Sequence, residues 1–559
     1  MRPCEKRNTG DMVLPLTTPS ATHEVTNQPP PLAPYDASAD AALLEGLRRE
    51  GAGWFEDDLR RVGRHAGSEE AQRWAVEANT FEPVLRTHDR YGNRVDEVDF
   101  HSSWHDLMRV AVAEGNAASA WADSRPGAHV ARYAGLLTWG HTEAGHGCPM
   151  AMTYAAVPAL RHEPALAAVY EPLLTSRVYD PGLRVPTSKR GLLAGMGMTE
   201  KQGGSDVRTN TTVATPTSED GVYTLRGHKW FTSAPMCDVF LVLAQAPGGL
   251  SCFLVPRVLP DGTRNTFRIQ RLKDKLGNRS NASSEPEFDG TVAWLVGAEG
   301  RGVKTIIEMV NCTRLDCVSG SAVLMRKAFV EALHHTRHRS AFGAKLVDQP
   351  LMRNVLADLA VESEAATTLT LRLAGAADRS IRGDEGERAF RRIATAIGKY
   401  WVTKRAPMFA AEALECLGGN GYVEDSGMPR LYREAPLNSI WEGSGNVNAL
   451  DVLRVLGKQP TAAQALLAEL SLARGADPRL DAAVNDIAAA LSSPADVEVR
   501  ARHLVERMAI ALQASLLVRH APNAVADAFC ASRLGGGGYA FGTLPAGTGF
   551  TAILDRAAS

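Results

Sequence analysis

The fold of this chain is decided by the stretch Gly195-Met-Gly-Met-Thr-Glu-Lys-Gln-Gly-Gly-Ser-Asp206 together with its successor Gly227-His-Lys-Trp-Phe-Thr-Ser-Ala234. The first is a glycine-rich turn flanked by hydroxyl and amide donors, and adjacent glycines without a Cβ let the backbone approach a ligand closely. The second places Trp230 and Thr232 on alternate positions, so both would face the same side of a strand. Each stretch alone is typical of ordinary turns and cores. Together they predict one ligand that meets an aromatic face and a hydroxyl.

In this order the two stretches resemble the flavin-binding segments of the acyl-CoA dehydrogenase family, and they are most similar to its AidB-like branch. Most acyl-CoA dehydrogenases carry Thr-Glu-Pro-x-Ala-Gly-Ser-Asp, and here Lys201-Gln202-Gly203 replaces Pro-x-Ala. The resemblance implies FAD as the cofactor. The FAD-binding residues that it implies in these two stretches are Met198, Thr199, Gly204, Ser205, Trp230, Phe231 and Thr232.

Length and composition allow several ordinary globular domains. The 559 residues are 45% hydrophobic and 22% charged, with a net charge of −2, so large buried cores can form and no global field attracts nucleic acid or anionic membrane. The eight cysteines are scattered without a C-x-x-C pair, which suits a reducing compartment and gives no support for a metal site. We find no signal peptide and no apolar run long enough to span a membrane, so the cytoplasm is the expected location.

The spacing of apolar residues and of turn residues changes along the chain. Apolar residues recur at helical spacing on both sides of a middle region with short alternating segments and Pro/Gly turns. The predicted fold class is multidomain α+β, an acyl-CoA dehydrogenase-like plan with an extra C-terminal helical domain; periodicity leaves open whether the β-domain closes as a barrel. The predicted parts are a disordered tail (1–24), an N-terminal α-helical domain (25–190), a middle β-domain (191–299), a C-terminal helical bundle (300–458) and an extra helical domain (459–559).

The proline-rich segment Asn27-Gln-Pro-Pro-Pro-Leu-Ala-Pro34 is expected to be extended and polyproline-like. Either it docks on another surface of the protein or it is merely a linker, and the sequence leaves both interpretations open.

A second informative motif is Ser439-Ile-Trp-Glu-Gly-Ser-Gly-Asn446. The glycines predict a chain bend around Glu442, and apolar neighbours would desolvate its carboxylate and raise its pKa towards that of a useful base. Considered alone, Glu442 could equally be a surface acid or a helix cap. The motif resembles the family's Tyr-Glu-Gly-Thr, which implies that Glu442 removes the α-proton of an acyl-CoA.

The same resemblance assigns further residues around this carboxylate. It places Ser444 and Asn446 against the flavin, and Trp441 in the substrate pocket where the family usually has Tyr. It also places Arg454 in that pocket, paired with Glu442, whereas the residues alone allow a surface arginine whose stem covers apolar neighbours.

Two other segments resemble parts of the family that reach the FAD of a neighbouring subunit. Arg339-Ser-Ala-Phe-Gly343 and Gln349 offer a guanidinium for a diphosphate and a ring for packing, and the glycines of Glu415-Cys-Leu-Gly-Gly-Asn-Gly-Tyr422 allow close backbone approach. The residues implied are Arg339, Phe342, Gln349, Gly418 and Gly419. The resemblance therefore implies an oligomer, typically a homotetramer.

Two functions fit these observations. The first is an FAD-dependent acyl-CoA dehydrogenase with an unknown electron acceptor. The second is a flavin-containing protein of the DNA alkylation response that binds duplex DNA and has a weak or vestigial dehydrogenase site. DNA binding requires phosphate neutralisation, but residues 461–559 hold eight Arg and no Lys against nine Asp and Glu, a net charge of −1. The best basic stretches are 264–279 and 325–339.

Overall fold

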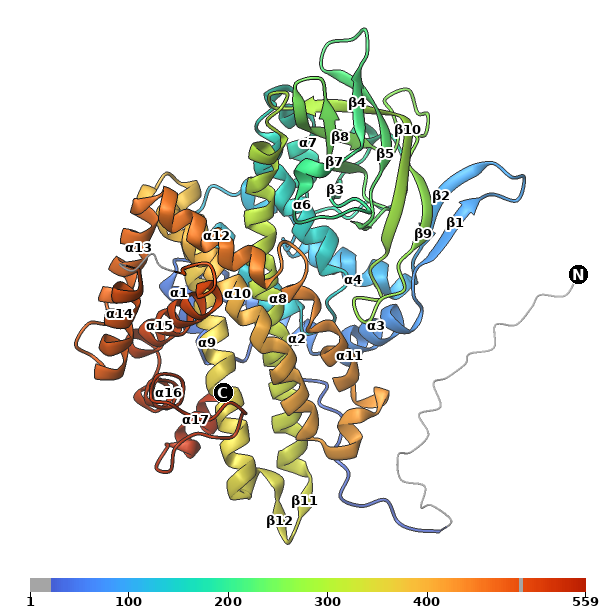
Figure 1. The fold of residues 1–559 in the computed structure, drawn as a ribbon. Coiled ribbons are helices and arrows are strands. Elements are labelled where there is room, and N and C mark those ends of the chain that lie inside the picture. The colour runs from blue at the N-terminus through green and yellow to red at the C-terminus, as the bar shows by residue number, and fades with distance from the viewer. Residues whose placement is uncertain (1–21, 492–495, 559) are drawn as a thin grey trace, which may run out of the picture.

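A small β-domain lies at one end of a larger helical body in this computed structural model, which describes residues 22–491 and 496–558 (Figure 1). The predicted multidomain α+β class, with helices, a β-domain, a helical bundle and further C-terminal helices in that order, is confirmed. The predicted disordered tail falls mainly on residues 1–21, which lie outside the described residues.

The N-terminal part is a compact group of helices that begins where Asp40 caps the first of them. The Asp40 carboxylate accepts hydrogen bonds from the amides of Ala42 and Leu43, which satisfies orphan donors of the first turn. The helices are α1 (Ala41–Arg49), α2 (Glu56–Ala66), α3 (Glu69–Thr80), α4 (Ser102–Ala113), α5 (Ala128–Trp139), α6 (Gly147–Leu160) and α7 (Pro164–Leu174).

This region also contains a β-hairpin that the sequence interpretation, which read it as entirely helical, missed. Strands β1 (Val84–His88) and β2 (Arg94–Asp99) pair antiparallel, and Asp89 closes the turn by accepting from the amides of Tyr91 and Asn93. Strand β1 alternates exposed with less exposed positions, which is the strand periodicity, whereas β2 buries only Asp96 at its centre. The hairpin packs on the β-domain, where the amide of Ile269 donates to Asp96 at 3.0 Å.

The middle domain closes on itself, which the sequence had left open. Strands β7, β4, β5, β10 and β8 pair in a circuit, because β8 pairs with both β10 and β7. Closure removes exposed sheet edges, and β3 and β9 extend the sheet. The strands are β3 (Ala194–Gly197), β4 (Val213–Pro216), β5 (Val222–His228), β6 (Thr232–Ser233), β7 (Val239–Ala246), β8 (Gly249–Pro256), β9 (Arg268–Leu272) and β10 (Ser283–Val296).

Long helices form the bundle that follows the β-domain. α8, α9 and α10 pack against one another, and α8 also packs on α6, so the bundle and the N-terminal helices share one core. A short hairpin of β11 (Ser340–Ala341) and β12 (Ala344–Lys345) joins α8 to α9 at the bottom of Figure 1. The bundle helices are α8 (Gly302–His338), α9 (Pro350–Ile381), α10 (Glu385–Glu415), α11 (Met428–Glu434) and α12 (Gly445–Lys458).

The C-terminal helices pack against α9 and α10 of this bundle. Ion pairs fasten them: Arg533 bonds Asp358 at 2.5 Å, and Glu469 bonds both Arg372 and Arg519, at 2.7 and 2.6 Å. The helices are α13 (Pro460–Ser471), α14 (Pro478–Leu491), α15 (Ala501–His520), α16 (Asn523–Phe529) and α17 (Phe550–Ala557).

Candidate active site

The two stretches that carry the family resemblance, 195–206 and 227–234, touch each other at the edge of the β-domain. The amide of Trp230 donates to the carbonyl of Thr199 at 2.9 Å, and the amide of Lys201 donates to His228 Nε2 at 3.0 Å. Beneath these bonds, Lys229 Nζ lies 2.7 Å from Glu200 Oε1, and both side chains are fully buried. The turn and the strand that follows it are therefore held in a fixed mutual position.

Glu200 and Lys229 belong to the quoted stretches, but sequence reasoning gave neither a role. Burial alone would raise the pKa of Glu200, but the charge and hydrogen bond of Lys229 and the donors of Thr211 and Thr212 lower it to about 2. Burial lowers the pKa of Lys229 to about 8, against the attraction of Glu200. The available signal was a pair of opposite charges, one in each stretch, among apolar and small residues.

We call residues 198–205 and 227–234 the cradle; they carry an aromatic ring, Trp230, and a buried hydroxyl, that of Thr232. Thr232 is 1% exposed, and its Oγ1 has no hydrogen-bond partner within the described part of the chain. Lys273 Nζ lies 3.2 Å from the ring centroid of Trp230, close enough for a cation–π interaction. Phe231 is 52% exposed. A Cβ at Gly204 would collide with the Thr199 side chain, so this glycine permits the close turn.

Glu442 lies in a loop whose main-chain carbonyls accept hydrogen bonds from two cationic side chains. Lys399 Nζ on α10 donates to the carbonyls of Trp441 (2.7 Å) and Gly443 (2.5 Å), and Arg314 Nε on α8 donates to the carbonyl of Glu442 (3.1 Å). The φ of Glu442 is 57°, a left-handed conformation that is rare outside glycine. Such strained backbone persists when its surroundings fix it, and here three successive carbonyls have charged donors.

The Glu442 carboxylate itself has a neutral partner. Thr313 Oγ1 donates to Glu442 Oε2 at 2.7 Å. Burial raises the pKa of Glu442, and the Thr313 bond, Lys399 and Arg314 only partly counteract it. Asp451 bonds Arg314 at 2.8 Å, which balances part of the guanidinium charge. The result is a carboxylate with an increased affinity for a proton.

Cys148 lies in the first turn of α6 and is buried. Its pKa is raised to about 11, mainly by burial, and the same thiol interacts with Ser233 of β6 and with the charge of Glu442. α6 packs both on α8, whose Thr313 bonds the Glu442 carboxylate, and on β3 of the β-domain. Sequence reasoning missed Cys148, Thr313, Arg314 and Lys399 because each looks like an ordinary helix residue.

The other predicted residues of the Glu442 loop lie on or near α12. Trp441 Nε1 donates to Asn438 Oδ1 at 3.0 Å, Ser444 occupies the N-cap of α12, and Asn446 is exposed in its first turn. Arg454 pairs with Asp451 at 3.3 Å and its side chain is 61% exposed. The arginine that bonds the Glu442 residue is Arg314, so the predicted pairing of Arg454 with Glu442 is wrong; its place in the substrate pocket stays a prediction.

The remaining predicted residues lie at the opposite end of the bundle. Arg339 and Phe342 belong to the hairpin after α8, Gln349 precedes α9, and Gly418 and Gly419 begin a 3₁₀ turn after α10. Figure 1 places this hairpin at the bottom and the cradle strands at the top, so one subunit does not bring the two predicted groups together. Phe342 is 99% exposed.

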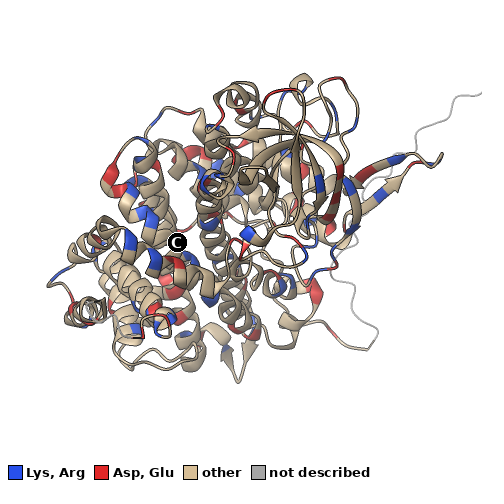
Figure 2. Ribbon diagram, turned by 45° about the horizontal axis from the view of Figure 1, so that its top comes forward, with Lys and Arg blue, Asp and Glu red and all other residues tan. Residues whose placement is uncertain are grey.

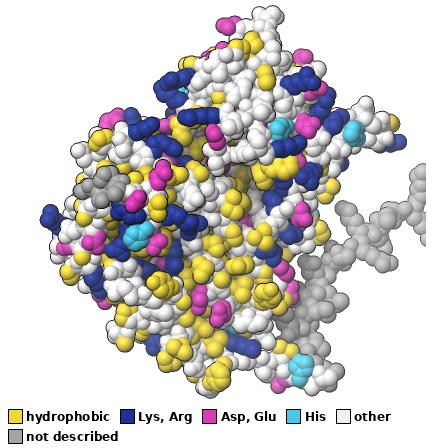
Figure 3. All heavy atoms as spheres, in the orientation of Figure 1, with side chains coloured by type: hydrophobic (Ala, Val, Ile, Leu, Met, Phe, Trp, Pro, Cys, Tyr) yellow, Lys and Arg dark blue, Asp and Glu magenta, His cyan; other side chains and the backbone are white. Residues whose placement is uncertain are grey.

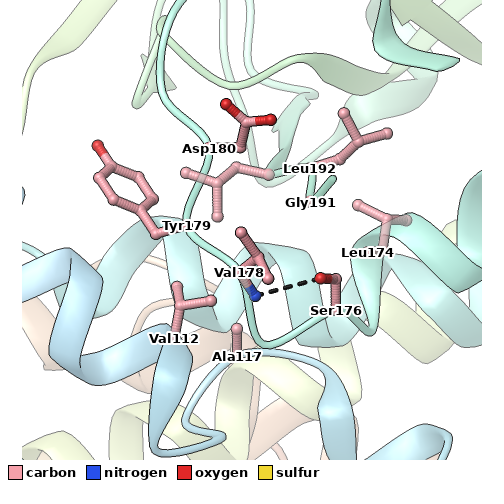
Figure 4. Close-up of a pocket in the computed structure, with 10 residues that line it drawn as sticks. Val112, Ala117, Leu174, Ser176, Val178, Tyr179, Asp180, Gly191 and Leu192 are labelled. Carbon is pink, nitrogen blue, oxygen red and sulfur yellow. Dashed lines mark hydrogen bonds between the residues drawn. The ribbon is translucent and has the colours of Figure 1, made fainter. Parts of the chain in front are cut away.

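A small pocket elsewhere, shown in Figure 4, contains none of the predicted site residues. It lies between α4, α7 and residues 176–193, and its lining is mainly apolar. Its acid, Asp180, already accepts from the amide of Arg190 at 3.0 Å. Within the described residues, no cluster of His, Cys, Asp or Glu suits a metal ion. No helix in residues 22–491 and 496–558 is both long and apolar enough to cross a bilayer.

A closed β-domain that follows one group of helices and precedes another, with a half-buried loop glutamate whose carboxylate is bonded to α8, defines a protein of the acyl-CoA dehydrogenase class. Comparisons agree: the chain matches the adaptive response protein AidB N-terminal domain (residues 27–181), the acyl-CoA dehydrogenase middle domain (195–291) and the acyl-CoA dehydrogenase C-terminal domain (300–457). The chain belongs to the acyl-CoA dehydrogenase family, in its AidB-like branch.

Individual relatives are similar over nearly the whole chain. AidB of Escherichia coli (strain K12) is 47% identical over 515 residues, which covers 91% of this chain and 94% of that protein. The solved structure of Caenorhabditis elegans ACDH-11 in complex with C11-CoA has a TM-score of 0.83 at 29% identity, covering 91% of this chain and 93% of the other. The structure described as Bd2924 apo-form has a TM-score of 0.81 at 32% identity, covering 89% and 100%.

Proposed function

We propose that this protein is an FAD-dependent acyl-CoA dehydrogenase that introduces an α,β double bond into an acyl-CoA thioester, with Glu442 as the base. The observation that carries the proposal is the Glu442 loop: its backbone is fixed by Lys399 and Arg314, while the carboxylate keeps one neutral hydrogen-bond partner and a raised pKa. A base with a raised pKa is better matched to a weakly acidic carbon.

The cradle fits the flat, polar ring of a flavin. Lys273 covers one face of Trp230, and the other face would stack on the flavin, while the Thr232 hydroxyl, without a partner among the described residues, would bond an edge of the flavin ring. Met198, Thr199, Gly204, Ser205 and Phe231 would complete the contacts on this side, with Ser444 and Asn446 approaching from the Glu442 loop. When bound, FAD supplies the acceptor for the β-hydride. Solved acyl-CoA dehydrogenases with FAD or FADH2 share the fold at 18–19% identity.

The residues of the chain handle the proton. The α-C–H beside the thioester is acidified when hydrogen bonds polarise the carbonyl. The proton passes to the Glu442 carboxylate. The hydrogen bonds from Lys399 to the carbonyls on either side of Glu442 keep that carboxylate in a fixed orientation during the transfer. Trp441, fixed by Asn438, shapes the pocket in place of the usual Tyr, and Arg454 contributes to its outer rim.

We propose further that the FAD site spans two subunits of a homotetramer. Within one subunit the second group of predicted residues, Arg339, Phe342, Gln349, Gly418 and Gly419, lies far from the cradle (Figure 1). Their surroundings are apolar and open: Leu351 and Tyr422 are each 83% exposed. Figure 3 shows hydrophobic side chains gathered over the lower part of the bundle, as an oligomer surface requires.

The alternative of a DNA-binding stress protein has less support. Acidic side chains neutralise the basic stretch 264–279: Arg279 pairs with Glu82, and Arg271 and Lys273 share Glu285. In Figure 2 basic and acidic residues are interspersed over the ribbon. Because phosphate binding depends on unneutralised cations, this surface is a poor nucleic-acid site.

Anaerobic titration with short, branched and long acyl-CoAs, followed by the visible absorbance of the flavin, tests the proposal. Bleaching by one class of acyl-CoA is expected, and that class names the substrate. A yellow protein that no acyl-CoA bleaches would overturn the dehydrogenase assignment. A salt-dependent shift of duplex DNA on a gel would then favour the alternative.

A further inference from the structure

The proline-rich segment near the N-terminus is docked along α8. We call residues 22–34 the N-terminal strap. The carbonyl of Pro30 is bonded by His334 Nε2 at 2.8 Å, and just beyond the strap Lys327 Nζ donates to the Tyr35 hydroxyl at 3.0 Å. The strap thus follows the helix from its C-terminal end backwards, and the linker interpretation of this segment is excluded.

Asn27 attaches the strap to the loop that follows α8. Its Nδ2 donates to the carbonyl of Ser340 at 2.8 Å, and its Oδ1 accepts from the amide of Ser340 at 2.8 Å. One side chain thus satisfies both main-chain groups of Ser340, as a neighbouring strand would. The φ of Asn27 is 57°, a left-handed conformation that Asn adopts more readily than most residues.

The main chain of Asn27 also holds Arg339. Arg339 Nη1 donates to the carbonyl of Asn27 at 2.6 Å, a charge-assisted bond. A guanidinium has five N–H donors, and this contact uses one of them, so the strap fixes the direction of Arg339 without consuming its capacity to bind an anion.

The strap reaches the second predicted segment as well. Asn420, between the glycines of the 418–422 turn, donates to Gln28 Oε1 at 3.5 Å. Adjacent strap residues therefore contact Arg339, Ser340 and Asn420. These lie in the two segments that we assign to the FAD of a neighbouring subunit, and these segments are about 80 residues apart in the sequence.

We propose that the N-terminal strap is a part of the cofactor site, with Asn27 as the residue that positions Arg339 and ties the two segments together for the FAD of the neighbouring subunit. This inference rests on the proposed subunit-spanning site. A long, flexible arginine loses rotamer freedom when it binds a diphosphate; because Asn27 has already removed part of that freedom, FAD binds more tightly.

The test measures FAD affinity of deflavinated protein by the quenching of flavin fluorescence, with oligomeric state followed by sedimentation. Three variants are compared with wild type: deletion of residues 2–21, deletion of residues 2–30, and Asn27→Ala. The shorter deletion leaves every contact described above in place and is the matched control. We expect it to bind FAD like wild type. Asn27→Ala keeps the carbonyl that accepts from Arg339 but loses the two side-chain hydrogen bonds to Ser340 that hold this carbonyl in place, so we expect it to weaken FAD binding about tenfold.

A second readout separates positioning from misfolding. Hydrogen exchange should show faster exchange at the Ser340 amide in Asn27→Ala, with α8 and α10 unchanged, because Asn27 Oδ1 is the acceptor of that amide. Equal FAD affinity in wild type and Asn27→Ala would overturn the role of the strap while leaving the proposed function intact. A wild-type protein that takes up no FAD would refute the proposed function, and the cofactor role of the strap with it.

Discussion

Two carboxylates in this protein are enclosed by the same helical bundle but differ in their partners. Glu362 on α9 receives Arg405 at 3.0 Å and Arg533 at 2.9 Å, and although burial opposes ionisation, these arginines lower its pKa to about 2. Glu442 has cations nearby, but they bond the main-chain carbonyls of its loop and its pKa is raised. The first carboxylate fastens the C-terminal helices to the bundle, and the second remains able to accept a proton.

The difference shows that burial alone does not determine the role of an acid. What decides it is where the neighbouring cations direct their hydrogen bonds. A cation on the carboxylate stabilises the charge, whereas a cation on the backbone fixes the position of the carboxylate at a smaller cost to its basicity.

Among changes to the ion pairs that hold the C-terminal helices on the bundle, Arg533→Ala is expected to have the largest effect on stability. This change leaves the buried Asp358 and Glu362 with fewer partners, and breaking a buried pair from one side costs about 3–5 kcal/mol. Urea unfolding of the C-terminal helices should show the loss. The matched control is Arg474→Ala, an exposed arginine of the same region, for which a change within about 0.5 kcal/mol is expected. Equal losses in both variants would mean that the network is not an anchor.

The next largest expected effect is a loss of unfolding free energy at acidic pH. The pKa of Glu362 lies near 2 in the folded protein, below its ordinary value of 4.5, so its contribution is present above pH 4.5 and is lost as the pH falls towards 2. The full contribution is about 3 kcal/mol. The difference in unfolding free energy between wild type and Glu362→Gln should therefore be larger at pH 6 than at pH 3, and a difference independent of pH would contradict the assignment.

On the active-site side, Lys399→Met removes the donor of two loop carbonyls while leaving the Glu442 carboxylate chemically intact. We expect flavin reduction by the best acyl-CoA to slow by about tenfold to a hundredfold, because small displacements of a reacting group are costly, with FAD content unchanged. Stopped-flow absorbance measures the rate. Lys458→Met, at the exposed end of α12, is the control for charge. An unchanged rate of flavin reduction in Lys399→Met would show that the hydrogen bonds of Lys399 do not position Glu442.

The smallest expected effect is a shift in the pH profile. The hydrogen bond from Thr313 lowers the pKa of Glu442, so Thr313→Val should raise that pKa further. Because the base must be ionised to take a proton, the acidic limb of the flavin-reduction rate should move to higher pH. Thr336→Val is the control, since that hydroxyl on the same helix bonds only helix carbonyls. A shift to lower pH would contradict the arrangement.

Short motifs carried most of what the sequence could predict. The glycine-rich stretches and the Glu442 motif show their chemistry within a dozen residues, and they led to the fold class and to the family. Closure of the β-domain depends on β8 pairing with both β7 and β10, which no local pattern records. The β1–β2 hairpin did have a local signal, the turn at Gly92 between alternating segments, which the surrounding helical pattern obscured.

The predicted site lacked the cations that helices distant in sequence contribute to the Glu442 loop. Arg314 lies 128 residues from Glu442 and Lys399 lies 42 from Trp441, and each is one cation among many on a long helix. The family resemblance pointed to Arg454 instead, but its side chain turns to Asp451. Proximity along the chain cannot reveal which cation reaches a loop, because that depends on how the helices pack. The roles of the predicted FAD contacts stay predictions.

Glu442 is proposed to be the proton acceptor, unlike Glu362, which is a structural acid. The measurement that tests this proposal most directly is the anaerobic rate of flavin reduction in Glu442→Gln, compared with wild type at equal FAD content. The account predicts a folded, yellow protein whose flavin is reduced at least about a thousandfold more slowly, since the amide cannot take the α-proton. Reduction at the wild-type rate would contradict the account and require another base.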